Sequence, residues 1–280
     1  MAVVALTSAS GAPGVTTTAL AMVLVWPRPV LLVEADVSGS SDVLAGYLRG
    51  AVSPAGRSLL GVAIGHRQDR LETALQDQTV PLDEAGTRRL VPAVPDSAQA
   101  VSLEPVWGPL ATAFSSLERD GIDVVVDAGR SGALHGPEPL LRSADLVLLV
   151  TRTHLPAVAS ARARAGHLRA ALGSAGSADD RLGLLLVGDG RPYTGQEISE
   201  ATGLPILAAM AWDPTAAEVL SVGAPRPRRW EQSAYVRGAR AAVDVVATRL
   251  SQHEAPPAAV VHEVPGNVLR PVAPSGPHRG

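Results

Sequence analysis

The sequence predicts an α/β protein built on a doubly wound, mostly parallel sheet, and three observations support this fold class. Several short apolar runs lack the polar alternation of a half-exposed strand, so we expect strands that are buried on both faces. Stretches with helical spacing separate these runs, which is typical of a parallel sheet covered by helices. The first run leads through a glycine-containing turn and three threonines into an apolar helix, and this layout is typical of a loop that binds phosphate.

Apolar runs and their stop signals give the elements of the first half of the chain. The helix after the first strand ends before Pro27 and Pro29, because proline cannot continue a helix. Pro109 is expected to begin a later helix, since proline suits the first helical turn. We therefore expect strands at 3–6, 30–33 and 123–127, helices at 16–25, 42–49, 58–65 and 110–119, and an irregular segment at 68–100 that contains a strand at 89–94.

The second half of the chain continues the alternation of strands and helices. We expect strands at 146–150, 182–187 and 206–211, and helices at 157–172, 195–202, 216–222 and 234–250. The last helix carries apolar residues at helical spacing, so we expect it to dock on the sheet. The residues that follow are Pro-rich and aperiodic. The sequence therefore predicts one domain at 1–251 and a disordered tail at 252–280.

Composition excludes several classes of protein. Apolar residues make up 46% of the 280 residues, which is ample for a sizeable core, and a net charge of −3 gives no global attraction to nucleic acid or anionic membrane. The absence of cysteine excludes disulfides, thiolate metal sites and cysteine nucleophiles. The first residues lack the features of a signal peptide, and no apolar run approaches the ~18 residues that span a bilayer. We therefore expect a cytoplasmic protein without a transmembrane segment.

The turn after the first strand nearly matches the phosphate-binding pattern G-x-x-x-x-G-K-[ST], but its lysine is missing. When Gly14 and Thr16 are aligned with the pattern, Val15 takes the position of the lysine and Ala9 that of the first glycine. That lysine normally reaches the β- and γ-phosphates and offsets charge that develops during phosphoryl transfer. Losing such a charge-assisted contact costs roughly 2–4 kcal/mol. We therefore expect any binding of a nucleotide to be weak.

Backbone amides of the same turn are the expected contacts of a phosphate group. The expected nucleotide-binding residues are Gly11, Ala12, Pro13, Gly14, Val15, Thr16 and Thr17. Pro13 has no N–H to donate, so the turn has lost a donor as well as a charge. The chain contains no lysine, since all 24 basic residues are arginine. Arg28 and Arg130 are the candidates for recruitment from outside the loop, but nothing in the sequence argues for either.

Acidic residues follow two of the other predicted strands. Ligands of such sheets gather at the carboxyl ends of the strands. There the hydroxyl of Thr16 and the carboxylate of Asp127 are the expected Mg²⁺-site residues, and Asp36 is the candidate catalytic residue that orients the attacking water. Structural roles remain open for both acids, because Asp127 also suits a cap on the loop after its strand and Asp36 a cap on the next helix. Glu34 is expected at a strand end without a metal.

Together these segments resemble the ParA/MinD branch of P-loop ATPases, in the SIMIBI class, whose loop reads K-G-G-x-G-K-T-T. In this alignment Gly11, Gly14, Thr16 and Thr17 match the loop, Ala12 does not, and Ser10 and Val15 replace the two lysines. Residues 31–36 are similar to the strand that ends in D-x-D, with Glu34 for the first Asp, and 121–127 to the strand Y-D-x-[IV]-[IV]-[IV]-D. The asparagine that reads adenine is absent, and Gly188 and Asp189 stand in its place. The resemblance covers residues 1–250.

The resemblance implies a P-loop NTPase fold, ATP or ADP with Mg²⁺ as weakly held cofactors, and a homodimer that forms through the nucleotide-site face. Because both lysines are replaced, the chain is expected to be a pseudo-ATPase with weak or no hydrolysis, similar to TadZ/CpaE-type pilus-localisation proteins. The expected function is a positioning or scaffold factor in pilus or secretion assembly or in partitioning. Its partner would be a secretion or pilus ATPase or a partitioning factor, which would also recruit it peripherally to the membrane.

Two other functions remain open. The first is an active ATPase in chromosome or plasmid partitioning, in which an arginine replaces the missing lysine. The second is non-specific DNA binding through Arg162, Arg164 and Arg169, which share one Ala-rich helix. We favour neither, because the loss of both lysines disfavours turnover and the net negative charge disfavours DNA. A solvated helix face is the simpler interpretation of these three arginines.

Overall fold

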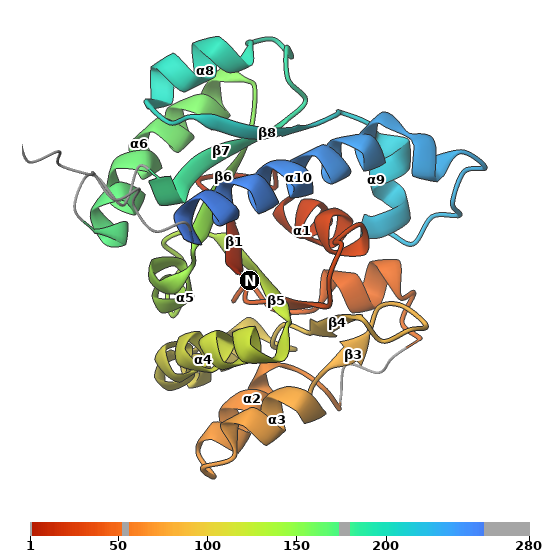
Figure 1. Ribbon diagram of the computed structural model, residues 1–280, viewed down its shortest axis with the longest axis vertical. Coiled ribbons are helices and arrows are strands. Elements are labelled where there is room, and N and C mark those ends of the chain that lie inside the picture. Colours follow the sequence, from red (N-terminus) through yellow and green to blue (C-terminus); the bar gives the residue numbers. More distant parts are fainter. Residues whose placement is uncertain (1, 52–55, 174–179, 255–280) are drawn as a thin grey trace, which may run out of the picture.

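The computed structural model describes residues 2–51, 56–173 and 180–254. In this part of the chain, eight strands form one sheet in the order β3-β4-β2-β5-β1-β6-β7-β8 (Figure 1). Neighbouring strands are parallel except β3, which pairs antiparallel with β4. The strands are β1 Val3–Ser8, β2 Val30–Glu34, β3 Val80–Pro81, β4 Arg88–Val91, β5 Asp123–Arg130, β6 Leu146–Arg152, β7 Leu182–Val187 and β8 Ile206–Met210.

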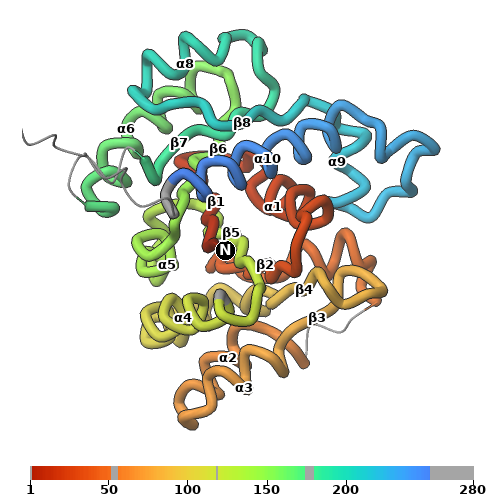
Figure 2. The backbone as a smooth tube through the Cα atoms, viewed as in Figure 1, coloured from red at the N-terminus to blue at the C-terminus, as the bar shows by residue number. Residues whose placement is uncertain are grey.

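Helices cover both faces of the sheet. One face carries α1 Val15–Leu24, α9 Pro214–Ser221 and α10 Ala234–Glu254. The other carries α2 Leu59–His66, α3 Leu71–Asp77, α4 Glu104–Leu117, α5 Glu138–Ser143, α6 Leu155–Leu172 and α8 Gly195–Thr202. Shorter helical turns are a π-helical turn at Val43–Tyr47 and 3-10 helices at Ser97–Leu103, Glu118–Asp120 and Trp230–Gln232. Figure 2 shows α10 passing beside α1 and β8, both of which it contacts.

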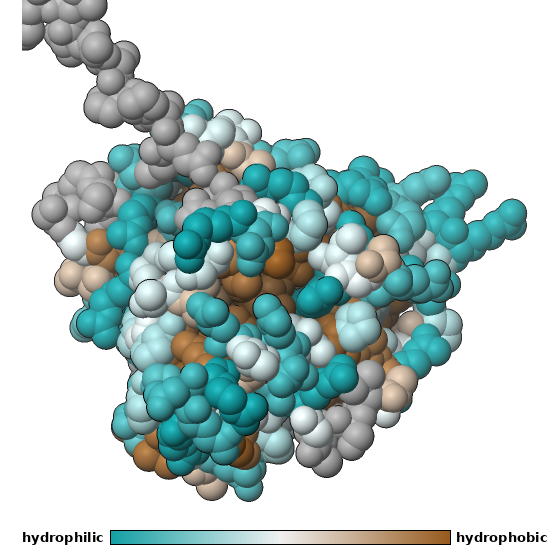
Figure 3. Space-filling model, turned by 60° about the horizontal axis from the view of Figure 1, so that its bottom comes forward, coloured by the Kyte–Doolittle hydropathy of each residue, from teal (hydrophilic) through white to brown (hydrophobic). Residues whose placement is uncertain are grey.

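Two apolar cores lie between the sheet and these helices. Successive strand residues point to opposite faces, so Leu6 of β1 packs in the core under α1 while its neighbour Ala5 packs in the core under α4. This double burial explains why the strand sequences lack alternation. Figure 3 shows hydrophilic residues over much of the visible face, with apolar surface gathered in a hollow near its middle. None of the helices among the described residues is long and apolar enough to cross a bilayer.

The predicted strands are all present, which confirms the doubly wound, mostly parallel fold class. The prediction for the helix at 110–119 is wrong at its start, because α4 begins at Glu104 and Pro109 lies inside it. Val106 and Trp107 in the first turns of α4 are buried in the core, and their burial outweighs the helix-breaking tendency of proline. The segment at 68–100, predicted to be irregular, contains α3 and most of a 3-10 helix.

The C-terminal helix continues beyond the predicted end at residue 250, since α10 runs to Glu254. The predicted disordered tail otherwise falls at 255–280, outside the described residues.

The amino edge of the sheet is held by one buried carboxylate. Asp123 is fully buried, and its oxygens accept hydrogen bonds from the Trp26 indole at 2.7 Å, the Ala2 amide at 2.9 Å and the Arg28 guanidinium at 3.0 and 3.1 Å. Such a carboxylate is stable inside a protein only because several donors satisfy it. Arg28 therefore lies at the edge opposite the carboxyl ends of the parallel strands, and the prediction that it is a candidate for the phosphate charge is wrong.

Candidate functional site

The carboxyl ends of the parallel strands bring the predicted site residues to one edge of the sheet. The central strand β1 pairs with β5 on one side and with β6 on the other, and β2 lies beyond β5. In this register Glu34 at the end of β2 is opposite Asp127 of β5. The loop at 9–14 leaves the same edge from β1 and leads into α1.

The loop has the backbone conformation of a turn that only glycine adopts readily. Gly11 has φ +57° and Gly14 has φ +96°, and both lie in the left-handed region. A Cβ added to either residue would meet no atom within 4 Å, so the backbone conformation, rather than crowding, requires glycine. Gly14 precedes the first residue of α1, and its carbonyl accepts from the Thr18 amide at 2.9 Å. The free amides of the first turn of α1 therefore point towards the loop, as an anion site requires.

Val15 occupies the position of the missing lysine and packs inward. Its side chain is only 7% exposed and belongs to the apolar core beneath α1. Pro13 is also buried, whereas Gly11 and Ala12 are exposed. The loop thus fits a phosphate group in backbone geometry but contributes no positive side chain of its own.

Asp127, one of the two residues predicted to hold Mg²⁺, is buried and lies near the other one, Thr16. The Oδ1 of Asp127 accepts from the Gly129 amide at 3.0 Å. Its Oδ2 is buried without a hydrogen-bond partner among the described residues. Burial raises the pKa of Asp127. The value reaches about 6 although the nearby Thr16 hydroxyl and Gly129 amide act in the opposite direction. A buried carboxylate oxygen without a partner, beside a hydroxyl, fits Mg²⁺, which keeps several waters and takes one or two protein oxygens together with phosphate.

Asp36 lies on the same edge, next to the strand that carries Asp127. Its Oδ1 accepts from the Ser38 amide at 2.8 Å, so part of the carboxylate holds the turn that follows β2. The other oxygen faces Gly129, where a Cβ would come within 2.3 Å of it. Gly129 is therefore needed both for its φ of +56° and for the space that Asp36 occupies. The Asp36 carboxylate also contributes to the raised pKa of Asp127, after the larger effect of burial.

Glu34 is a buried structural carboxyl with a strongly raised pKa. It is 3% exposed, accepts from the Val43 amide at 3.2 Å and accepts from the Ser41 hydroxyl. Burial raises the pKa of Glu34 to about 8, and the Asp127 carboxylate adds to this rise. Glu34 therefore holds a proton at neutral pH and ties β2 to the segment at 41–43.

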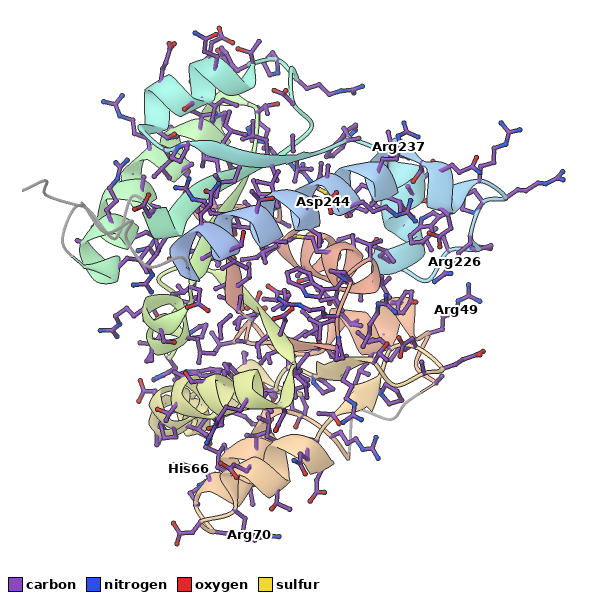
Figure 4. All side chains as sticks on the ribbon, in the orientation of Figure 1. Arg49, His66, Arg70, Arg226, Arg237 and Asp244 are labelled. Carbon is purple, nitrogen blue, oxygen red and sulfur yellow. The ribbon has the colours of Figure 1, made fainter. Side chains whose placement is uncertain are left out.

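Among the described residues, Arg152 is the arginine that contacts the phosphate loop. It ends β6, and its Nη2 donates to the carbonyl of Ala12 at 3.1 Å. Its guanidinium lies 4.7 Å from the centre of the Trp212 ring. The other candidate, Arg130, ends β5 at the same edge and is exposed. Figure 4 labels Arg226 in the segment between α9 and α10, Arg237 in the first turn of α10 and Arg49 after the π-helical turn, all towards the right of the view.

A small pocket adjoins Arg152 where the carboxyl ends of β6, β7 and β8 meet. It has a volume of about 190 Å³ and is lined by Arg152, Thr153, His154, Val187, Gly188, Arg191 and Trp212. The Thr153 hydroxyl fixes this corner by bonding the Gly188 carbonyl at 2.7 Å. Gly188 stands where the resemblance places an adenine-reading asparagine, so this pocket has no amide side chain. The sequence reasoning missed Arg152 and Trp212, although Arg152 lies two residues beyond one apolar run and Trp212 directly follows another.

Comparison with solved structures gives the fold independently. The cell division ATPase MinD of Pyrococcus furiosus is similar with a TM-score of 0.68 and 17% identity, over 88% of this chain and 98% of that one. The septum site-determining protein MinD of Pyrococcus horikoshii, complexed with Mg-ADP, gives 0.64 and 18%, over 88% and 95%. A plasmid partition protein of Borrelia burgdorferi gives 0.63 and 12%, over 89% and 99%. The chain therefore has the MinD/ParA-type P-loop fold. No protein-family model and no curated protein sequence matches it.

Proposed function

We propose that the protein is a ParA/MinD-type positioning or scaffold factor whose nucleotide site is weakened. The observation that carries this proposal is the packing of Val15 into the core at the position of the phosphate-binding lysine. The loop retains the amides and glycine conformations that cradle a phosphate, and Asp127 retains a free oxygen for the Mg²⁺ shell. Such a site binds a nucleotide weakly and lacks the main cation that stabilises transferred phosphate.

We infer the cellular role from the same observations, namely a phosphate loop that keeps its backbone conformation and has lost its lysine. A fold that keeps its shape but turns over slowly suits a protein that marks a place and recruits another. We propose a homodimer that forms through the nucleotide-site face, as part of pilus or secretion assembly or of partitioning, with a secretion or pilus ATPase or a partitioning factor as its partner. TadZ/CpaE-type localisation proteins are the nearest analogy for this role. In this role Asp36 would orient water only in the residual, slow reaction.

The second candidate is a working partitioning ATPase in which an arginine replaces the lysine. The contact between Arg152 and the carbonyl of Ala12 favours it, because it brings a guanidinium to the loop. The two candidates differ in turnover. A scaffold retains at most weak binding, whereas an ATPase couples binding to hydrolysis.

Calorimetric titration with Mg-ATP and Mg-ADP, combined with a phosphate-release assay, tests the proposal. Loss of roughly 2–4 kcal/mol of contact energy corresponds to an affinity on the order of 30- to 1,000-fold weaker than that of an intact loop. We expect a dissociation constant near the millimolar range and no sustained phosphate release. Low-micromolar binding with steady turnover would instead establish the ATPase. Sedimentation velocity with and without Mg-ATP, on the same samples, tests whether the protein is a dimer.

A further inference from the structure

We propose that Arg152 supplies, from within the same chain, the positive charge that the phosphate loop has lost, and that its ligand is a phosphate group of a bound nucleotide. This inference rests on the proposed function in one respect, namely that a residual nucleotide site exists at the loop.

The position of Arg152 is fixed by the sheet and by two contacts. Ser8 at the end of β1 pairs with Val150 of β6, so the end of β6 runs alongside the start of the loop. From there the guanidinium reaches the loop and donates to the Ala12 carbonyl at 3.1 Å. Its other side lies against the Trp212 ring at 4.7 Å, within the range of a cation–π contact. The side chain is thus held beside the loop before any ligand arrives, which lowers the entropic cost of binding.

The charge of Arg152 has no counter-ion among the described residues. Arg28, Arg88 and Arg240 each pair with a carboxylate, whereas the contacts of Arg152 are a backbone carbonyl and an aromatic ring. Its Nε is buried without a hydrogen-bond partner in the described part of the chain. A partly buried guanidinium with an unused donor is unfavourable unless an anion completes it.

The surroundings of Arg152 select the chemistry of that anion. The adjoining pocket of about 190 Å³ is lined by a second arginine, Arg191, and by His154, and no carboxylate from the described part of the chain lines it. Arg152 also reaches the loop, through its hydrogen bond to the Ala12 carbonyl. Arginine binds phosphate oxygens through two parallel N–H donors, and one donor already holds the loop. The pocket is smaller than the roughly 300 Å³ of a typical small-molecule site, so it suits one part of a nucleotide while the loop holds another.

Nucleotide affinity of the full chain with Arg152 changed to glutamine tests this inference. The matched control is Arg228→Gln, which removes an exposed arginine from the segment between α9 and α10, outside the candidate site. Titration with Mg-ADP, followed by NMR because the expected affinity is in the millimolar range, should show Arg152→Gln binding roughly 10- to 100-fold more weakly than the unchanged chain, the loss expected for one charge-assisted contact. Arg228→Gln should bind as the unchanged chain does. Arg152→Lys should recover part of the affinity, because it restores the charge without the planar fork.

A double variant separates a phosphate role from a purely structural one. If Arg152 takes the role of the lysine, Val15→Lys should raise the affinity more in the Arg152→Gln background than in the unchanged chain. The reason is that the unchanged chain already has one cation at the phosphate, so a second cation there adds less. Circular dichroism and thermal unfolding of every variant report whether the fold is intact. Should Arg152→Gln fail to fold, Arg152→Lys with Val15→Lys still measures the coupling.

Three results would overturn the inference. Equal affinities of Arg152→Gln and Arg228→Gln would show that Arg152 does not contact the ligand. Tighter binding by Arg152→Gln would show that Arg152 blocks the site. If the unchanged chain does not bind Mg-ADP at millimolar concentration, a nucleotide phosphate is not the ligand of Arg152. The proposed scaffold function would still stand. Rapid turnover of ATP would have the opposite effect, because it would refute the scaffold function and leave the role of Arg152 intact.

Discussion

Replacing Glu34 with glutamine should stabilise the protein and flatten the dependence of its stability on pH. The Glu34 carboxyl is buried beside Asp127, and its pKa rises from 4.5 to about 8, chiefly because of burial. Glutamine has nearly the same shape, and its two terminal atoms can meet both partners of Glu34: the carbonyl oxygen accepts from the Val43 amide, and the NH2 group donates to the Ser41 hydroxyl oxygen. It differs in carrying no charge at any pH.

The sign of the effect follows from the direction of the shift. Since the folded-state pKa is higher than the unfolded one, the stability that Glu34 contributes is fully present below about pH 4.5 and is lost as the pH rises through about 8. Within this range of pH, the free energy of unfolding falls by about 1.4 kcal/mol for each pH unit. Glu34→Gln avoids this loss, so its advantage should be under about 1 kcal/mol at about pH 5 and roughly 3 kcal/mol at about pH 7.

Urea unfolding followed by tryptophan fluorescence, at several values between about pH 5 and about pH 8, measures this difference. The control Glu84→Gln neutralises an exposed carboxyl and should follow the unchanged chain at every pH. Subtracting the profile of the unchanged chain removes the contributions of histidines and other acids, which all three proteins share. A Glu34→Gln advantage that is absent, or that stays constant across the window, would refute the argument that burial keeps this carboxyl protonated.

Two other substitutions test the packing around the site and at the opposite edge. Asp123→Ala leaves an indole, an amide and a guanidinium without their buried acceptor, so it should cost roughly 3–5 kcal/mol, whereas exposed Asp120→Ala should change the urea midpoint little. Gly129→Ala should displace Asp36, because the new Cβ would lie 2.3 Å from its carboxylate at a φ of +56°, and thermal unfolding should show a loss of at least about 1 kcal/mol. The control Gly108→Ala, in a helix with open space around it, should be neutral or stabilising by about 0.5–1 kcal/mol.

The sheet was predictable because burial on both faces leaves a direct mark on the sequence. In β2, which is buried at every residue, all side chains except that of the last residue, Glu34, are apolar. Gly14 has a backbone angle that other residues avoid, so its position in the turn was also predictable. The start of α4 was harder to predict. Pro109 is a strong local signal for a helix start, but the burial of Trp107 extends the helix past it, and burial depends on tertiary contacts that local rules do not contain.

The arginine at the loop could have been found by a rule that the sequence reasoning applied only to acids. Asp36 and Asp127 were chosen because they lie at or just beyond the ends of apolar runs, where parallel strands meet the ligand edge. By the same rule Arg152 lies on the ligand edge, whereas Arg28 precedes its strand and belongs to the opposite edge. The contact with Ala12 could not be predicted even so, because it depends on β6 lying next to β1 in the sheet. The sequence of a single strand does not show which strands become its neighbours.

The packing of Val15 explains how the fold persists without the lysine, and it makes a last prediction. Val15→Lys replaces a 7%-exposed core side chain with one whose ammonium must reach out to the loop, so without ligand it should lower stability by roughly 1–3 kcal/mol. Ligand that binds only the folded state returns RT ln(1 + [L]/Kd), about 2.7 kcal/mol at 100 times Kd. Thermal unfolding should therefore show Val15→Lys below the unchanged chain without nucleotide and a larger upward shift of its midpoint with Mg-ATP. If Val15→Lys is as stable as the unchanged chain without nucleotide and gains no more from Mg-ATP, valine contributes nothing to the core there, and the missing lysine does not set the strength of the site.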